Sequence, residues 1–313
     1  MSEPSSKRAI PAITFVILTR DEAIHIERAI ASAAPVSRHV LVVDSGSTDG
    51  TIELARNAGA EVLQNRWINY ATQFNWALEN LPSDTEWVFR LDADEFLTDR
   101  LCGEIAEKLA EVAQTAAGIN ISRYMNFCRG KVRFGGLFPV RVTRLFRPGK
   151  GRCENRWMDE HIVIDGPTID FSGEIVDDNL KPLSWWIDKH NAYASREVVD
   201  LLNREFGFME SDPGTSLQEG SQARKKRWIK DHLYSRMPGG LRALAYFLYR
   251  FVIRLGFLDT REGRMFHVLQ GFWYRYLVDA KMHEVKAYMD EHQTDVVSAI
   301  GAVLKIDVGS GRP

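Results

Sequence analysis

Short apolar runs alternate with helical hydrophobic patterns along the N-terminal part of the chain. The apolar runs have the length and composition of buried strands and span residues 13–18, 40–43, 61–64 and 87–91. The segments between them carry apolar residues at helical spacing, over residues 21–30, 52–57 and 70–80. Strands that alternate with helices in this way form βαβ crossovers, so the pattern predicts an α/β fold with a mostly parallel central sheet.

Carboxylates follow two of the predicted strands. Asp44 ends the second strand, and Asp92, Asp94 and Glu95 come directly after the fourth. Open α/β sheets bind ligands at the carboxyl ends of their strands, so we expect these acids to face one crevice. Two aspartates separated by one small residue suit a hard divalent cation that also holds phosphate oxygens. The alternative interpretation is an acidic first turn of a helix.

The turn after Asp44 is built from small and hydroxyl-bearing residues. Residues 45–51 read Ser-Gly-Ser-Thr-Asp-Gly-Thr and lead into the next predicted helix. The backbone N–H groups at a helix start offer a nucleotide a place to approach. One of these side chains also has to cap the helix, whatever the function. We expect Asp44 to accept hydrogen bonds from a ribose or base, while the acids after the fourth strand hold metal and diphosphate.

Composition and charge exclude several classes of protein. With 313 residues and 45% hydrophobic content, the chain is globular and long enough for two domains. The 40 basic and 42 acidic residues give a net charge of −2, so no nucleic-acid partner is expected. Cys102, Cys128 and Cys153 lack metal-ligand spacing and predict free thiols in a reducing compartment. Residues 1–10 carry no secretory signal and no charge-free run could span a bilayer, so we expect a cytoplasmic protein, soluble or peripheral on a membrane.

The C-terminal third has a different character from the rest. Glycines and an Asp-Pro-Gly triplet interrupt regular structure over residues 203–222. In the helical run that follows at 241–258, one stripe is formed by Arg242, Tyr246, Arg250 and Arg254. Two interpretations stay open: a helix lying in the headgroup region of a membrane, or a bundle helix that covers the α/β domain. We expect a disordered tail at 1–10, an α/β domain at 11–202 and a basic, aromatic helical region at 203–313.

The chain resembles glycosyltransferase family 2, nucleotide-sugar enzymes with the A-type glycosyltransferase fold, which is a Rossmann-like domain. The motifs that carry the resemblance lie in order at residues 16–22, 42–51 and 91–95. A longer pattern resembles the branch with lipopolysaccharide-core β-glucosyltransferases, through residues 133–136, 144–147, 159–166 and 189–193. The similarity covers residues 12–200 and fits the remainder only loosely.

The resemblance implies a site, residue by residue. Asp44 matches the family aspartate that contacts the uridine part of the donor. Asp94 matches the metal-contacting acid, with Asp92 beside it and Mg²⁺ or Mn²⁺ as the cofactor. The residues that the resemblance assigns to the nucleotide sugar are Thr19, Asp44, Ser45, Gly46, Asp92 and His190.

The resemblance also places a general base. An inverting displacement needs one base beside the acceptor hydroxyl, while the metal stabilises the departing nucleoside diphosphate. Glu160 is our first choice, with Asp159 as the second. Many family members read Glu-Asp here, whereas this chain reads Asp-Glu-His, so the choice between the neighbours stays open. An exposed acidic turn is the structural alternative.

The resemblance therefore predicts an inverting, metal-dependent hexosyltransferase of bacterial surface-polysaccharide biosynthesis, for lipopolysaccharide or exopolysaccharide. The expected donor is UDP-glucose or a related UDP-sugar, and the expected acceptor is a lipid-linked saccharide or the lipopolysaccharide core. We expect peripheral contact with the cytoplasmic face of the inner membrane. The alternative is a non-catalytic, membrane-associated homologue that only binds nucleotide sugars.

Overall fold

The chain folds into two compact units, Met1–Lys181 and Pro182–Pro313, each with its own hydrophobic core. The computed structural model describes residues 10–112, 114–137, 140–154, 162–209 and 240–308. The division falls before helix α5, Leu183–Phe206, whereas the expected domain boundary falls after residue 202. Helix α5 belongs with the C-terminal helices, because its buried side chains pack in the same core as theirs.

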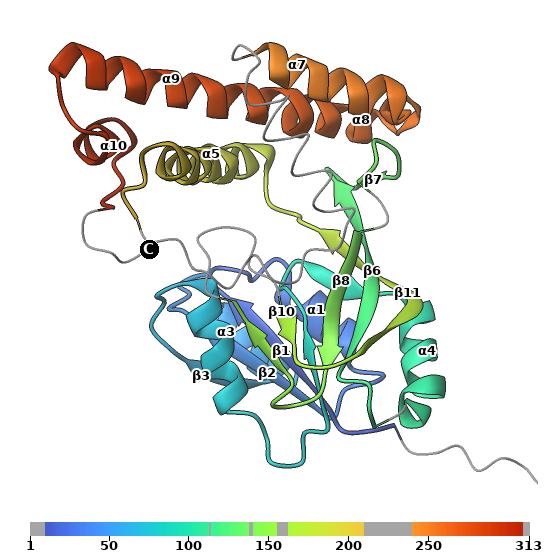
Figure 1. Cartoon of the computed structure of the whole chain (residues 1–313). Coiled ribbons are helices and arrows are strands. Elements are labelled where there is room, and N and C mark those ends of the chain that lie inside the picture. The colour runs from blue at the N-terminus through green and yellow to red at the C-terminus, as the bar shows by residue number, and fades with distance from the viewer. Residues whose placement is uncertain (1–9, 113, 138–139, 155–161, 210–239, 309–313) are drawn as a thin grey trace, which may run out of the picture. The chain divides into compact units, whose positions relative to one another are not determined.

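The first unit is built on a mixed sheet that has nine strands within the described residues (Figure 1). In spatial order its strands are β3 (Glu61–Gln64), β2 (His39–Asp44), β1 (Ile13–Thr19), β4 (Trp87–Arg90), β8 (Val140–Phe146), β6 (Gly118–Phe127), β11 (Thr168–Asp178) and β5 (Glu95–Leu97), and β7 (Gly130–Val132) pairs with β6. The strands β3, β2, β1 and β4 all run parallel, and β8 runs antiparallel to β4. A separate hairpin joins β9 (Gly151–Cys153) to β10 (Ile162–Ile164). The predicted α/β class is confirmed, and so are the four predicted strands.

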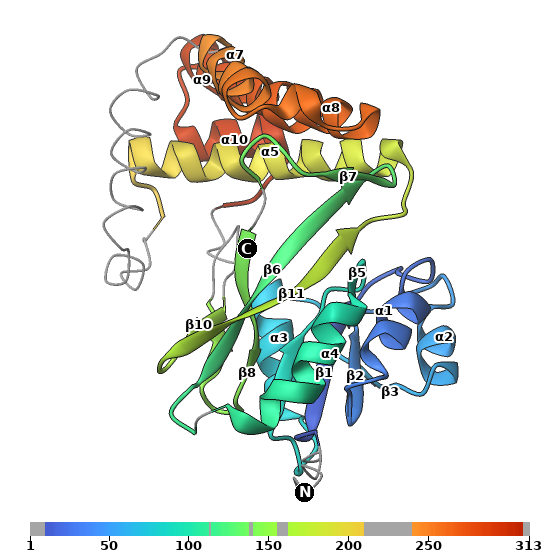
Figure 2. The same cartoon turned by 90° about the vertical axis from the view of Figure 1, so that its right-hand side faces the viewer.

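Helices cover both faces of this sheet (Figure 2). They are α1 (Ile26–Ala33), α2 (Thr51–Asn57), α3 (Tyr70–Glu79) and α4 (Asp99–Lys108), the last followed by a short 3₁₀ turn at Leu109–Glu111. Phe15 and Ile17 of β1 pack in a core with α1, α2 and α4, whereas Val16 packs in a second core with Phe74 of α3. Because both faces are covered, β1 is mostly apolar, and Phe15 to Leu18 form a continuous apolar run rather than an alternation.

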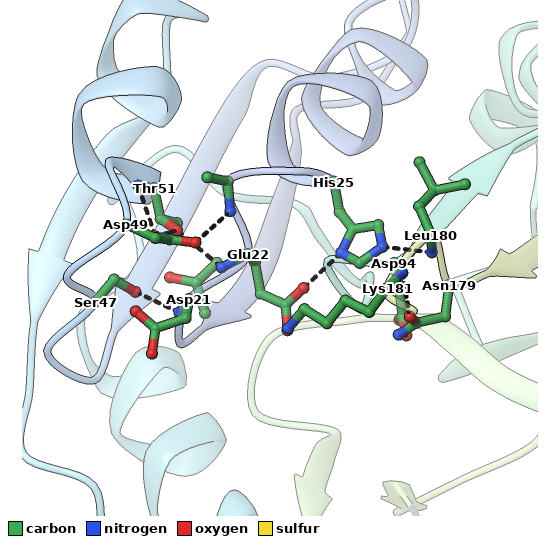
Figure 3. Close-up of polar contacts among 12 residues, drawn as sticks. Asp21, Glu22, His25, Ser47, Asp49, Thr51, Asp94, Asn179, Leu180 and Lys181 are labelled. Carbon is green, nitrogen blue, oxygen red and sulfur yellow. Dashed lines mark hydrogen bonds and ion pairs between the residues drawn. The ribbon is translucent and has the colours of Figure 1, made fainter. Parts of the chain in front are cut away.

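Helix α1 begins at Ile26, later than the predicted start at residue 21. Asp21 adopts a left-handed backbone conformation with φ of 55°, which cannot continue into a right-handed helix. The backbone N–H of Asp21 donates to Ser47 Oγ over 2.8 Å, and that of Glu22 donates to Thr51 Oγ1 over 2.8 Å (Figure 3). Because the turn after β2 accepts these hydrogen bonds, the segment forms a loop fixed to its neighbour instead of a first helical turn.

The second unit is helical in its described residues. Its elements are α5, α7 (Leu241–Leu248), α8 (Arg261–Val268), α9 (Tyr274–His292) and α10 (Val296–Leu304), with π-helical segments at Tyr249–Ile253 and Leu269–Trp273 and a 3₁₀ turn at Gly256–Leu258. Helix α9 packs against both α5 and α10, around a core that includes Val198, Val278 and Ile300. In the part of the chain that the structure describes, no helix combines the length and the apolar character needed to cross a bilayer.

The predicted helix over residues 241–258 ends early. Its regular coil extends through α7 and the π-helical segment, and Leu255 then adopts a left-handed conformation with φ of 60°. That conformation is uncommon for residues other than glycine, and it breaks the coil. The apolar pattern continues past this point, so the spacing of apolar residues does not mark the turn, although Gly256 follows the break directly.

Two cations of the basic stripe, Arg242 and Arg250, face the interior of the second unit, whereas Arg254 is exposed. Arg242 Nε donates to Asp279 Oδ1 of α9 over 2.6 Å. Arg250 is buried, with its Nη2 lying 3.3 Å from Nδ1 of His267 in α8. Both arginines pair with residues of later helices, and a pattern within one helix does not reveal such partners.

We expect Gly173→Ala to destabilise the first unit by about 1–3 kcal/mol, because overpacking forces backbone shifts. A Cβ at Gly173 of β11 would lie 2.5 Å from Leu101 Cα of α4, and the N–H of Gly173 donates to Glu104 Oε2 over 2.6 Å. Gly103→Ala is the matched control, because Gly103 is exposed in α4 with nothing within 4 Å of its Cβ position. The control should raise stability by up to about 1 kcal/mol. Urea unfolding measures both, and equal effects would contradict the close approach of β11 to α4.

Candidate active site

The acids of the second and fourth predicted strands lie at one edge of the sheet. β2 and β4 both pair in parallel with β1, so the carboxyl ends of all three strands meet there. Thr19 at the end of β1 is the register partner of Asp44 at the end of β2. The segment with Asp92 and Asp94 follows β4 on the other side of β1.

Asp44 is fully buried and holds the turn that follows it. Its Oδ1 accepts hydrogen bonds from the backbone N–H groups of Gly46 and Ser47, over 2.8 and 2.9 Å. Its Oδ2 accepts from Thr19 Oγ1 over 3.0 Å and from Ser47 Oγ. The carboxylate is therefore occupied by its own turn and by the end of β1.

The exposed residues of this turn are Gly46, Thr48 and Asp49. Gly46 has φ of 90°, a conformation that disfavours any residue with a Cβ, and open space surrounds its Cβ position. Ser45 Oγ accepts a hydrogen bond from Gln73 Nε2 of α3 over 3.2 Å. A planar or phosphate-bearing ligand can thus approach the main chain at Gly46 closely, while Asp44 and Ser45 fix its conformation.

Asp92 is anchored through both of its carboxylate oxygens. Oδ1 accepts from the hydroxyl of Tyr70 over 2.8 Å, and Oδ2 accepts from Arg144 Nη2 over 3.1 Å. Burial raises the pKa of Asp92, but the charges of Arg144 and Arg90 more than offset it, so the pKa lies below its ordinary value. Asp92 is an anion whose position is set by protein groups.

Asp94 is held differently, with one carboxylate oxygen committed and the other open. Oδ2 accepts from Asn179 Nδ2 over 2.9 Å, and the backbone carbonyl accepts from Asp178 N–H over 3.0 Å. Among the described residues, none donates a hydrogen bond to Oδ1 of Asp94. The segment that follows β11 therefore orients a carboxylate that keeps a free oxygen.

The residues present fit a divalent cation only if the substrate shares in binding it. Within the described ranges, no group of three or more His, Cys, Asp or Glu side chains is placed to hold a metal. Mg²⁺ sites commonly use one or two carboxylates together with waters and substrate phosphates, rather than an all-protein cage. The open oxygen of Asp94, next to the ionised Asp92, matches that arrangement.

A buried histidine ties the loop after β1 to the segment with Asn179 (Figure 3). His25 Nε2 accepts the backbone N–H of Leu180 over 2.8 Å, so the ring is neutral and carries its proton on Nδ1. That proton is donated to Glu22 Oε2 over 2.6 Å, and Glu22 Oε1 pairs with Lys181 Nζ over 2.8 Å. The sequence analysis missed these residues, because His25 and Leu180 lie 155 positions apart and no local motif links them.

Beneath these acids lies a buried ion pair between Glu95 and Arg144. Glu95 Oε1 is 2.6 Å from Arg144 Nη2, and the two side chains are only 1% and 3% exposed. Burial raises the pKa of Glu95 to about 7, against the attraction of Arg144. Glu95 Oε2 also accepts a hydrogen bond from the backbone N–H of Asp92 over 3.1 Å, so Glu95 helps to fix the backbone at Asp92.

Comparison with known proteins assigns the family. A model described as glycosyl transferase family 2 matches residues 14–152. A protein of Rickettsia prowazekii (strain Madrid E), "Uncharacterized glycosyltransferase RP128", is 39% identical over 202 residues, which are 61% of this chain and 68% of that protein. The chain belongs to glycosyltransferase family 2. With the sheet described above, membership establishes the A-type glycosyltransferase fold, and the expected resemblance is confirmed.

Two further comparisons extend the range of relatives of this family 2 glycosyltransferase. The "Lipopolysaccharide core biosynthesis glycosyltransferase LpsC" of Rhizobium meliloti (strain 1021) is 31% identical over 163 residues, 50% of this chain and 58% of that protein. The structure of glucosyl-3-phosphoglycerate synthase from Mycobacterium tuberculosis, with Mn²⁺ and uridine-diphosphate, aligns at 20% identity and a TM-score of 0.29. That alignment covers 37% of this chain and 44% of the synthase, and it carries no conclusion about the present protein.

Three predicted site residues of this family 2 glycosyltransferase remain to be described. Asp159 and Glu160 fall outside the described residues. His190 belongs to α5 of the second unit, where its Nδ1–H donates to the carbonyl of Trp186 over 2.8 Å and its ring stacks on the indole of Trp186 at 3.5 Å. Burial lowers the pKa of His190, so the ring favours its neutral form with Nε2 as an acceptor.

We expect the free energy of unfolding to fall as the pH rises from about 5 to about 7, because of Glu95. Its carboxyl has a pKa of about 7 in the folded protein against an ordinary value of 4.5, so folding takes up a proton in that window. Glu95→Gln removes this proton. The slope of unfolding free energy against pH should become less negative by up to about 1.4 kcal/mol per pH unit, measured by urea unfolding.

Glu61→Gln is the matched control, because Glu61 is exposed on β3 and the substitution should leave the slope unchanged. Burial and Asp94 also raise the pKa of Asp177, so part of the slope persists in every variant. A Glu95→Gln protein with the wild-type slope would contradict a protonated Glu95 at neutral pH.

Proposed function

We propose that this protein is an inverting, metal-dependent glycosyltransferase that moves a hexose from a UDP-sugar to a lipid-linked saccharide or lipopolysaccharide-core acceptor. The observation that carries the proposal is that two features lie at the same edge of the sheet. One is the backbone turn that Asp44 holds closed, and the other is Asp94, with its open carboxylate oxygen. The name of the Rhizobium meliloti relative supports the lipopolysaccharide acceptor. The preference for UDP-glucose rests on the resemblance described above.

The turn after β2 is the proposed nucleotide-binding element. Thr19 and Asp44 shape it through buried hydrogen bonds, and Ser45 is fixed by Gln73 of α3. The open backbone at Gly46 can then meet the uridine and ribose closely. Asp44 thus acts chiefly by orienting the turn that the nucleotide contacts.

Asp94 is the proposed metal-contacting acid, and Asp92 contributes a fixed negative charge beside it. A bound Mg²⁺ or Mn²⁺ would neutralise the diphosphate that departs from the sugar. Asn179 donates a hydrogen bond to Oδ2 of Asp94, so Oδ1 is the oxygen proposed to bind the metal. Tyr70 and Arg144 keep Asp92 ionised and in place, so the ion meets a preformed anionic site.

Proton transfer needs a separate group near the acceptor hydroxyl. Glu160 is the proposed general base, with Asp159 as the alternative, on the strength of the family pattern alone. His190 is proposed as a diphosphate or metal contact. Trp186 occupies its Nδ1, and its Nε2 can bind a metal ion through the lone pair or, once protonated, donate to a phosphate oxygen. An inverting displacement then requires one base and no covalent intermediate on the protein.

We expect Asp94→Asn to abolish both the metal-dependent binding of the UDP-sugar donor and the slow hydrolysis of that donor. A UDP-sugar with Mn²⁺ should stabilise the wild-type protein by about 2.7 kcal/mol at a hundredfold excess over its Kd, and thermal-shift assays can measure this. Asp165→Asn is the matched control, because the side chain of Asp165 is 87% exposed and pairs only with Lys150 at 3.4 Å. If dTDP- or GDP-sugars stabilise the protein and UDP-sugars do not, the donor assignment fails.

The same assays separate the catalytic protein from a homologue that only binds. Such a homologue would show the thermal shift without any hydrolysis of UDP-sugars. Glu160→Gln and Asp159→Asn should both keep the thermal shift, because a base near the acceptor does not hold the donor. The variant that loses transfer to an acceptor while keeping the shift identifies the base.

We expect Asn179→Ala to weaken Mn²⁺ binding about 10- to 100-fold, as the loss of a hydrogen bond to a metal-binding side chain commonly does. The variant leaves Oδ2 of Asp94 without its donor. Calorimetric titration of Mn²⁺ into the UDP-bound protein measures the effect without relying on turnover. Asn80→Ala is the control, because Asn80 is exposed and donates only to the carbonyl of Trp76. Unchanged Mn²⁺ affinity in Asn179→Ala would show that Asn179 does not position Asp94.

A further inference from the structure

In the helix after residue 240, charged side chains point into the second unit and apolar side chains are exposed, the reverse of an ordinary surface helix. Two of its three cations point into the second unit: Arg242 pairs with Asp279, and Arg250 is only 3% exposed. The guanidinium of Arg250 also lies over the ring of Phe266, 5.9 Å from its centroid. The polar stripe that would make this helix an ordinary solvent-facing element is therefore turned toward α8 and α9.

The opposite face of the same segment is apolar and exposed. We call it the apolar face, and its members are Leu244, Leu248, Val252, Ile253, Leu255 and Leu258. They recur at three- and four-residue spacing through α7 and continue into the turn after it, so they form a contiguous surface. Each is at least 41% exposed, and Ile253 reaches 69%. Contiguous apolar surface of this kind marks an interaction site far more often than scattered single residues do.

The apolar face ends in a rigid apolar tip. Leu255 takes a left-handed conformation, and the 3₁₀ turn Gly256–Leu258 follows at once. A buried pair fixes this turn from inside, since His267 Nε2 lies 2.8 Å from Asp259 Oδ2 and both side chains are 1% exposed or less. The tip therefore projects its apolar side chains from a fixed backbone.

The charges around the tip indicate what it meets. Arg254, Arg261 and Arg264 are exposed beside it, whereas the nearby Asp259 is buried against His267. The surface thus offers guanidinium groups next to apolar side chains, with Glu262 as the acid that remains on that stretch. This combination complements an interface of anionic headgroups over hydrocarbon, where arginine stems also bury their apolar part.

We propose that the apolar face docks peripherally on a bilayer that contains anionic phospholipids. Ile253, Leu255 and Leu258 enter at the level of the headgroups, and Arg254 and its exposed neighbours meet lipid phosphates. The described helices are not suited to cross a bilayer, so the contact lies in the plane of the interface. The proposal stands on the second unit alone and does not depend on which donor or acceptor the enzyme uses.

Vesicle co-sedimentation of the full chain tests this docking. The wild-type protein should bind vesicles of 1-palmitoyl-2-oleoyl-phosphatidylcholine with phosphatidylglycerol more tightly than vesicles of the phosphatidylcholine alone. Ile253→Glu with Leu258→Glu should lower binding at least about tenfold, because both charges enter the apolar layer. Ile169→Glu is the matched control, because Ile169 is an exposed isoleucine of the first unit. Equal binding by the double variant and the wild type would overturn the proposal.

Substitution of the exposed arginines separates the electrostatic contribution from the apolar one. Arg254→Ala with Arg261→Ala and Arg264→Ala should remove most of the preference for anionic vesicles and its dependence on salt. A triple variant that retains both would show that another surface supplies the charge, and the proposal would fail. Circular dichroism and the UDP-sugar thermal shift check that each variant is folded.

A milder probe covers the case in which the glutamate variants do not fold. Ile253→Cys in a Cys128→Ser background carries an environment-sensitive fluorophore at the tip, since Cys128 is the exposed native thiol. Its emission should shift to the blue on addition of phosphatidylglycerol vesicles. No shift would overturn the proposal. A wild-type dimer in sedimentation, disrupted by the double variant and indifferent to vesicles, would instead identify the apolar face as a contact between two copies.

Discussion

Parallel pairing of β2 and β4 with β1 is the constraint on which the candidate site depends. It brings three strand ends to one edge, and each end leads into a loop with polar groups that need partners. The turn after Asp44 and the loop with Asp21 satisfy one another, through side chains of one and backbone N–H groups of the other. Because neither loop forms these contacts alone, both loops take this conformation only when the sheet is assembled.

Asp92 and Asp94, which follow β4, have identical side chains but different hydrogen-bond partners. A buried charge is tolerated when it is paired and hydrogen-bonded, as Arg144 is with Asp92. The same guanidinium also donates to Glu95. Asp94 does not share this guanidinium, and among the described residues its carboxylate accepts one hydrogen bond, from Asn179. The same motif therefore contains an anchored aspartate and one with a free oxygen, which suits a site where protein and substrate share an ion.

In the second unit, too, buried charged groups are paired, and here the pairing leaves apolar side chains at the surface. Arg242 and Arg250 find partners inside, where an unpaired cation would be costly, and this rotation of the helix leaves Leu248 and Ile253 outside. The orientation of the helix that buries Arg242 and Arg250 therefore also exposes the apolar face. A chain that has both a membrane-docking surface and a sugar-transferring unit would suit an acceptor that is carried on lipid.

The sequence by itself determined the first four strands, the helices between them, the glycine-bearing turn and the acids at the strand ends. These features follow from local spacing of apolar residues and from turn chemistry, which need no distant partner. Tertiary structure alone decided that α1 starts late, that His25 meets Leu180, that Asp94 rather than Asp92 keeps an open oxygen, and which face of the helix after residue 240 points outward. Each of these depends on contacts between residues far apart in the chain, and no local pattern encodes which of two equivalent groups will be buried.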